Sequence, residues 1–133
     1  MQKLIYAFAN ATVPKVNLIV EDAIGSAYIA MNSKATGADV VYAWPTAKVG
    51  MMDAASAVKI MYADEIESGD ATEVIAEKTA EYQNVQGSVM SAAARGYVDS
   101  IVEPVDTRKY IIGAFEMLYT KFEDRPGKKH GTV

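Results

Sequence analysis

The sequence predicts an α/β layered fold in which short β-strands alternate with α-helices. Short runs rich in Val, Ile and Tyr are separated by segments whose apolar residues recur at helical spacing. Glycine and proline residues stand at many of the boundaries between these segments. A length of 133 residues is enough for one domain with one core, although the predicted strands are few for a complete α/β domain.

The first third of the chain is predicted to alternate helix, strand, turn and helix. Apolar spacing predicts a helix over residues 3–12, and the apolar run 16–20 reads as a short buried strand that ends at two acidic residues. A turn at residues 23–26 follows. Residues 27–34 are compatible with a second helix, for which Gly37 can supply a left-handed cap.

The middle of the chain contains two further predicted strands and a helix. Residues 39–44 form an apolar run rich in Val and Tyr, Pro45 interrupts it, and residues 47–52 form another extended piece. Asp53 suits the N-cap of a helix over residues 54–61. The small residues in the first turn of that helix favour close packing against a neighbouring element.

The remaining elements are predicted from caps and breaks. A polar break at 65–70 is followed by an exposed helix from the Asp70 cap through Tyr82. After a second break at 84–88 come a helix at 89–95, closed by Gly96, and a strand at 97–102, stopped by Pro104. Asp106 or Thr107 caps a final helix. Its apolar stripe of Ile111, Phe115, Leu118 and Phe122 predicts that it docks against another surface.

Composition excludes several classes of function. The chain has no cysteine and one histidine, which excludes disulfides and thiolate chemistry and disfavours a transition-metal site. A net charge of -4 gives no general attraction to nucleic acid. No membrane span or signal peptide is recognised, so we expect a cytoplasmic protein. The basic residues Arg125, Lys128 and Lys129 read as a solvated tail.

The most informative local feature is the passage from strand to helix at Gly25, Ser26 and Ala27. Backbone N–H groups at such a helix start can hold an anion or a developing oxyanion, and a tight turn without function is the alternative. Ser26 lacks the G-x-S-x-G context of a serine nucleophile, and His130 lies in the terminal tail. Tyr42 and Trp44 read as core residues.

Short motifs follow one another along the whole chain. They are LIYAFA at 4–9, ATVPKV at 11–16, AIGSAY at 23–28, YAWPTA at 42–47, VGMM at 49–52, ARGYVD at 94–99 with Pro104 and Arg108, and RP at 125–126 with KKHG at 128–131. In this order they resemble the carboxyltransferase β subunits of biotin-dependent acyl-CoA carboxylases, which include propionyl-CoA, methylmalonyl-CoA and acetyl-CoA carboxylases and related decarboxylases.

The resemblance implies a partial crotonase-like (ClpP/crotonase) fold. Subunits of this family contain two such domains, and the similarity covers the later part of the second one. Residues 1–133 would then be the C-terminal part of a carboxyltransferase C-domain on the biotin side, with a polar tail at 123–133. The acyl-CoA-binding first domain is not covered, so the chain would supply half of a site and be inactive alone.

The activity implied by the resemblance is carboxyl transfer between carboxybiotin and an acyl-CoA. The backbone of Gly25, Ser26 and Ala27 would form an oxyanion hole that stabilises the biotin enolate, and no basic side chain is required. Ile24, Tyr28, Trp44 and Pro45 would lie on the biotin side.

The implied cofactor is biotin on a separate carrier domain, with no metal. The implied partners are the missing N-terminal carboxyltransferase domain or subunit, the biotin carboxyl carrier protein, the acyl-CoA substrate and further copies of the chain. Neither nucleic acid nor membrane is expected as a partner.

Two positions depart from the family pattern. Ser26 stands where the family usually has a second glycine, and Asp53 stands near the position of another glycine. A side chain at Ser26 leaves its N–H in place, and a carboxylate at Asp53 either disfavours a nearby anion or caps its helix. A stand-alone crotonase-like CoA-thioester enzyme and a non-catalytic assembly module remain alternative functions.

Overall fold

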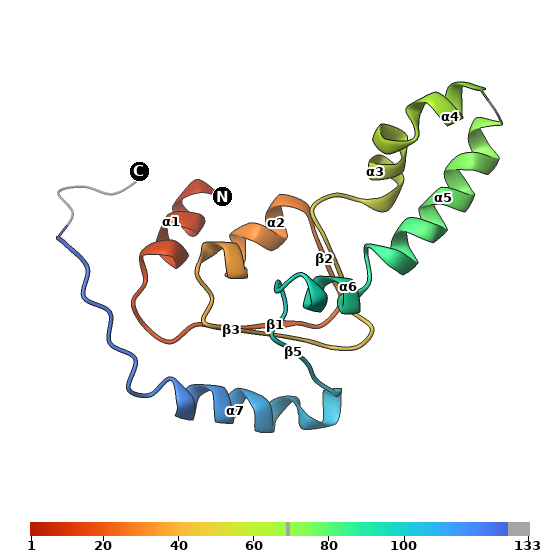
Figure 1. Ribbon diagram of the computed structural model, residues 1–133. Coiled ribbons are helices and arrows are strands. Elements are labelled where there is room, and N and C mark those ends of the chain that lie inside the picture. The colour runs from red at the N-terminus through yellow and green to blue at the C-terminus, as the bar shows by residue number, and fades with distance from the viewer. Residues whose placement is uncertain (69, 128–133) are drawn as a thin grey trace.

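The computed structural model describes residues 1–68 and 70–127 of the chain. Short strands and helices alternate along it (Figure 1). The strands are β1 (Val16–Ile19), β2 (Asp22–Ile24), β3 (Val40–Ala43), β4 (Lys48–Gly50) and β5 (Ser100–Ile101). The α-helices are α1 (Gln2–Asn10), α2 (Gly25–Ala30), α3 (Ala54–Met61), α4 (Ala63–Ser68), α5 (Ala71–Val85), α6 (Val89–Ala94) and α7 (Thr107–Met117), and the 3₁₀ turns are η1 (Lys34–Thr36) and η2 (Pro104–Asp106).

All strand pairs within the two small sheets are parallel. The larger sheet has the order β1-β3-β5, and the smaller sheet pairs β2 with β4. The chain therefore repeats one pattern: it passes through a strand of the larger sheet, then a strand of the smaller sheet, then a helix. The predicted α/β class and the alternation of short strands with helices are confirmed by this arrangement.

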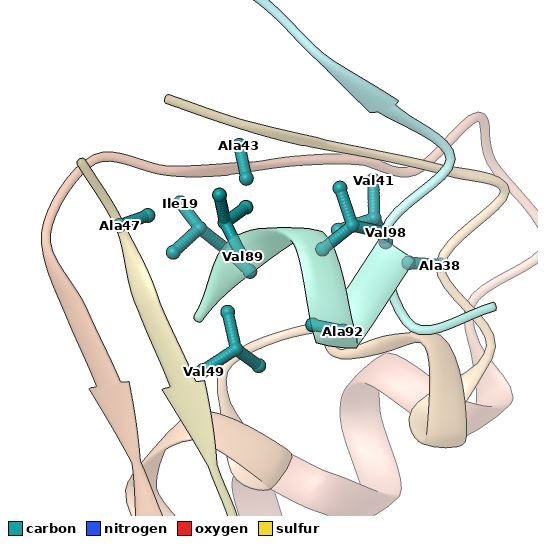
Figure 2. Packing of buried hydrophobic residues seen from close by; sticks show 9 residues of the cluster. All are labelled: Ile19, Ala38, Val41, Ala43, Ala47, Val49, Val89, Ala92 and Val98. Atoms are coloured by element: carbon teal, nitrogen blue, oxygen red, sulfur yellow. The ribbon is translucent and has the colours of Figure 1, made fainter. Parts of the chain in front are cut away.

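The main hydrophobic core lies between the two sheets around α6. Figure 2 shows Val89 and Ala92 of α6 among side chains from β1, β3 and β4. Val41 and Ala43 on β3 are fully buried there, which explains why that strand is apolar along its whole length. A second cluster on the other face of β3 joins Val40 and Tyr42 to α7.

Several predicted boundaries agree with the structure. Asp53 caps α3 by accepting a hydrogen bond from the amide of Ser56, and Asp70 caps α5 by accepting one from Thr72. Gly96, predicted to close α6, has a φ of 81°.

Three predictions about elements were wrong. Residues 22–24 form strand β2, where a turn was predicted from residue 23, because the pairing partner β4 lies far away in the sequence. Residues 63–68 form helix α4, although a polar break was predicted from residue 65. The helix predicted for residues 27–34 is α2, which starts earlier and ends at Ala30; Gly37 caps η1 instead, with a φ of 95°.

The final helix α7 docks through half of the predicted stripe and through one residue that was not predicted. Ala114 is buried, and Ile111 and Leu118 pack beside it against the cluster of Val40 and Tyr42. Phe115 and Phe122 were predicted to belong to this stripe, but they are 46% and 88% exposed. A small residue at the contact lets the helix approach β3 closely, and a pattern of large apolar residues does not reveal such a contact.

The segment after α7 returns to the N-terminal helix. Arg125 donates a hydrogen bond to the carbonyl oxygen of Ala9 and pairs with Glu123. The basic tail residue Arg125 is thus attached to α1. The predicted tail residues Lys128, Lys129, His130 and Gly131 lie outside the described residues. No described helix is both long enough and apolar enough to cross a membrane.

Asp39 joins three parts of the chain ahead of β3. Its carboxylate accepts a hydrogen bond from the Lys15 amide at 2.8 Å and another from Lys121 Nζ at 2.8 Å. Lys121 Nζ also donates to the carbonyl oxygen of Val13. Burial alone would raise the pKa of Asp39, but these hydrogen bonds and the charges of Lys121 and Lys15 lower it below the ordinary value.

We predict that Asp39→Asn lowers the free energy of unfolding at pH 7 by about 1–3 kcal/mol, because it removes a charge-assisted pair. A lowered pKa stabilises the fold above the unfolded-state value, and this contribution is lost as the pH falls through the folded-state value. As the pH falls below 3.8, the ordinary aspartate pKa, the free energy of unfolding of the original chain should therefore decrease more steeply than that of the variant. Urea unfolding over that pH range measures both effects.

Asp124→Asn is the matched control, because Asp124 is exposed. Equal stabilities of Asp39→Asn and Asp124→Asn at pH 7 would contradict the role given to the Asp39 pair.

Candidate functional site

The strand β2 passes directly into the helix α2 at Gly25. Gly25 has a φ of 75°, in the left-handed region that side chains other than glycine adopt at a cost. Ile24 precedes it in extended conformation as the N-cap, and its side chain makes no capping hydrogen bond. The turn is therefore sharp, and the start of α2 is not capped by its own sequence.

The first turn of α2 lies at the surface of the chain. In an α-helix the first N–H groups have no intrahelical acceptor. Ser26 and Ala27 occupy this turn and are both exposed, and within residues 1–68 and 70–127 neither amide donates to a backbone acceptor outside the helix. Two neighbouring donors with the positive end of a helix dipole behind them can stabilise negative charge.

A cavity of about 190 Å³ lies beside this turn. Its walls come from β2, α2, β4 and the segment leading into α3 on one side, and from α5, α6 and the residues after α6 on the other. The lining residues include Ile24, Tyr28, Met51, Gln86 and Tyr97. Residues more than 70 positions apart in the sequence thus share one hollow.

The structure brings some of the predicted site residues together and places others elsewhere. Ile24 and Tyr28 line the cavity, whereas Gly25, Ser26 and Ala27 do not line it as the described residues form it. Ala27 lines a neighbouring hollow that also contacts Tyr28. Trp44 and Pro45 follow β3 and do not line the cavity as the described residues form it. Trp44 instead donates from Nε1 to the Thr107 hydroxyl at 2.9 Å, which attaches the end of β3 to the start of α7.

Arg95 and Tyr97 are cavity residues that sequence reasoning did not assign to a site. They follow α6, and only the packing of α6 between the sheets places them opposite β2. The one signal was their position in the ARGYVD motif. Burial raises the pKa of Tyr28, and the neighbouring Tyr97 raises it further, so the Tyr28 hydroxyl stays protonated at neutral pH and can donate a hydrogen bond.

Two acidic and two basic side chains line the cavity. Asp22 and Lys48 are paired positions on β2 and β4, and Asp53 and Arg95 stand elsewhere on the rim. The Asp53 carboxylate accepts the Ser56 amide at 3.3 Å, so helix capping accounts for this residue. Among the described residues, no group of three or more His, Asp or Glu side chains could hold a metal ion.

The comparisons with known proteins decide the family. The model of the carboxyl transferase domain matches residues 1–133. The chain belongs to this family. The solved structure of transcarboxylase 12S, described as a hexamer assembly with methylmalonyl-coenzyme A and methylmalonic acid bound, superposes with a TM-score of 0.91 at 44% identity. That match covers 98% of this chain and 25% of the other, and it confirms the partial crotonase-like fold.

Curated relatives of this carboxyl transferase domain carry several names. The methylmalonyl-CoA decarboxylase subunit alpha of Propionigenium modestum is 46% identical over 98% of the chain and 26% of its own length. The biotin-dependent acetyl-/propionyl-coenzyme A carboxylase beta5 subunit of Mycobacterium leprae is 39% identical over 98% of the chain and 25% of its own length. The chain thus spans about a quarter of the length of these relatives.

For the turn itself, we predict that Gly25→Ala lowers the free energy of unfolding by about 1–2 kcal/mol through backbone strain. Space is not the cause, because an added Cβ would meet its nearest neighbour, the Met51 carbonyl oxygen, at an ordinary 3.8 Å. Gly113→Ala in α7 is the matched control. A Cβ there meets nothing within 4 Å, and Ala should stabilise the helix by about 0.5–1 kcal/mol.

Urea unfolding of both variants compares the two glycines directly. Stabilisation by Gly25→Ala would contradict the left-handed turn on which the site geometry rests.

Proposed function

We propose that this chain is the C-terminal, biotin-side part of a carboxyltransferase subunit and takes part in carboxyl transfer between carboxybiotin and an acyl-CoA. Its membership of the carboxyl transferase domain family supports the reaction class. The name of the Mycobacterium leprae relative supports the use of biotin. The observation that carries the proposal is the β2–α2 turn, where the exposed residues Ser26 and Ala27 stand between two cavity-lining residues, Ile24 and Tyr28.

The chemistry assigned to the chain is electrostatic. When bound, carboxybiotin would supply the carboxyl group, and the site would have to stabilise negative charge on the ureido oxygen. The amides of Ser26 and Ala27 would donate to this oxygen, and Gly25 would hold them in position by its left-handed conformation. Donors fixed in the backbone need no reorganisation when the charge appears, so they favour the transition state over the bound ground state.

The residues beside the turn fit a small, partly polar ring. Ile24 and the ring of Tyr28 offer apolar contact, and the protonated Tyr28 hydroxyl offers a donor. The cavity, at about 190 Å³, is smaller than the usual enclosing ligand site of roughly 300–1,000 Å³. A half-enclosed site would let biotin enter on a separate carrier domain. Another part of the subunit would then complete the enclosure. Trp44 and Pro45 would face the carrier from the end of β3.

The acyl-CoA site is assigned to a part of the subunit outside this chain. The chain covers about a quarter of its relatives, and we propose that residues 1–133 form a section of the C-domain that is inactive alone. A missing N-terminal carboxyltransferase part, a biotin carrier protein and further copies of the chain would complete a cytoplasmic complex with no metal. The hexamer named for transcarboxylase 12S supports an oligomer.

A non-catalytic assembly module is the second candidate, and the outer face of α7 favours it. Ile112, Phe115 and Tyr119 form an exposed apolar strip with 48%, 46% and 87% of their surface open. Such a strip is typical of a surface that binds another protein. Assembly through α7 and catalysis at the β2–α2 turn involve different faces and can be tested separately.

We predict that Ala27→Pro abolishes carboxyl transfer, because it removes one of the two proposed donors. Loss of one such donor typically reduces the rate by about 10²–10³. Proline is tolerated in the first turn of a helix, so the fold should survive. The measurement is carboxyl exchange from free carboxybiotin in a complex reconstituted with an N-terminal carboxyltransferase part.

Ser26→Ala is the control, since it removes a side chain and keeps the amide. Its rate should stay within a few fold of the original. Near-normal turnover by a folded Ala27→Pro variant would refute the oxyanion assignment. Equal losses in the two variants would show that the serine hydroxyl is needed too, which would contradict an oxyanion hole made of backbone amides alone.

A further inference from the structure

One wall of the cavity is a short segment that runs from the end of α6 to β5 and contains Arg95 and Tyr97. Its beginning is fixed by hydrogen bonds to α6. Gly96 has a φ of 81°, and its amide donates to the carbonyl oxygen of Ala93 at 3.0 Å. The Tyr97 amide donates to the carbonyl oxygen of Ala92 at the same distance. Two such bonds around a left-handed glycine form a Schellman motif, which sets the direction of the chain after a helix.

The end of this segment is fixed by Asp99, which binds β3 twice. The Asp99 amide donates to the carbonyl oxygen of Val41 at 2.8 Å, and Asp99 Oδ2 accepts the Val41 amide at 2.8 Å. The preceding residue, Val98, is buried in the same core cluster as Val41 (Figure 2). Tyr97 is therefore held between two attached points.

The Asp99 carboxylate also forms an ion pair with Lys34. Lys34 Nζ donates to Asp99 Oδ1 at 2.9 Å and to Oδ2 at 2.7 Å. It donates as well to the carbonyl oxygen of Asp39 at 3.1 Å, just before β3. Lys34 is thus held against the start of β3, next to the end of the segment that contains Tyr97.

Lys34 is connected in turn to the opposite wall of the cavity. It is the first residue of η1, and the buried hydroxyl of Ser33 beside it donates to the carbonyl oxygen of Ile29 in α2 at 2.9 Å. Tyr28, next to Ile29, lines the cavity. Burial raises the pKa of Tyr28 and the proximity of Tyr97 adds to that rise, so the two phenol groups lie close together.

We propose that Lys34 and Asp99 are positioning residues whose ion pair sets the width of the cavity between Tyr28 and Tyr97. This inference rests on the proposed function, in which a biotin ring binds beside Tyr28. Neither Lys34 nor Asp99 lines the cavity as the described residues form it, so both act through the tyrosines. Their side chains are 34% and 38% exposed, and a pair with such exposure contributes little to stability. Its main effect is therefore on the relative position of the two walls.

Lys34→Met tests this role, because it removes the cation and keeps an apolar side chain. In the complex reconstituted with an N-terminal carboxyltransferase part, the KM for free carboxybiotin should rise by about three- to fivefold, the range that an exposed ion pair supports. The value of kcat should stay the same, because the Ser26 and Ala27 amides remain and only binding shared by the ground and transition states is lost. Lys34→Arg keeps the cation and should restore the KM. Lys109→Met on α7 is the matched control, since Lys109 is exposed and lies outside the cavity.

Asp99→Asn removes the other charge and keeps a side-chain oxygen for the Val41 amide. If Lys34 and Asp99 act as one pair, the double variant should raise the KM no more than either single variant does. Independent increases that multiply in the double variant would contradict the pair.

The distance between the walls can be measured in the 133-residue chain by itself. The chain has no cysteine, so Met31→Cys and Arg95→Cys introduce spin labels only at these two exposed positions, at the end of α2 and on the opposite wall. Electron paramagnetic resonance should show a longer and broader distribution of label distances with Lys34→Met. Lys109→Met should leave the distribution unchanged.

An unchanged distance distribution in Lys34→Met would overturn the positioning role, and so would an unchanged KM in an active complex. A fall in kcat with an unchanged KM would also overturn it, because the pair would then affect the reaction and not the binding of the ring. A complex of the original chain without carboxyl transfer would instead contradict the proposed function, and the label distances would then decide the positioning role by themselves.

Discussion

The parallel pairing of β2 with β4 is the constraint on which the site depends. Because Ile24 lies opposite Gly50, the chain must turn at Gly25 next to the residues that lead into α3. The left-handed conformation of Gly25 makes that turn possible and starts α2 immediately, which leaves the Ser26 and Ala27 amides at the end of a strand with no acceptor from the helix. A slip of this pairing by one residue would reverse the side chains of β2 and move Ile24 away from the cavity.

The second wall of the site depends on how α6 is held. Val89 and Ala92 are small enough to fit between the sheets, and Gly87 accepts a hydrogen bond from Val49 on β4. These contacts fix the direction in which the chain leaves α6, and so they bring Arg95 and Tyr97 to the cavity. The core and the site are therefore built from the same contacts, and a large side chain at Ala92 would displace one wall of the cavity as well as disturb packing.

The sequence predicted features that local chemistry determines. Asp53 and Asp70 act as caps because a carboxylate can accept the free amides of the next helical turn, whatever lies elsewhere in the chain. The β2 strand could not be predicted from three residues, since its conformation comes from a partner more than 20 positions away. The docking face of α7 was predicted only in part: Ile111 and Leu118 were expected there, but Ala114, the small residue that makes the buried contact, was not. Likewise, Ile24 and Tyr28 were expected at the site from the motif, whereas the opposing Arg95 and Tyr97 depend on tertiary packing.

The two residues expected to depart from the family pattern, Ser26 and Asp53, have separate physical consequences. At position 26 the proposed role belongs to the backbone amide, which a serine keeps. Ser26 is exposed, so its hydroxyl needs no space inside the fold. Asp53 brings a negative charge to the rim, but its carboxylate is engaged by the Ser56 amide, and Lys48 and Arg95 stand on the same rim. Donors fixed in the backbone are less sensitive to such substitutions than charged side chains would be, because their direction is set by φ and ψ rather than by a rotamer. A site of this kind keeps its donors as long as the turn at Gly25 is kept.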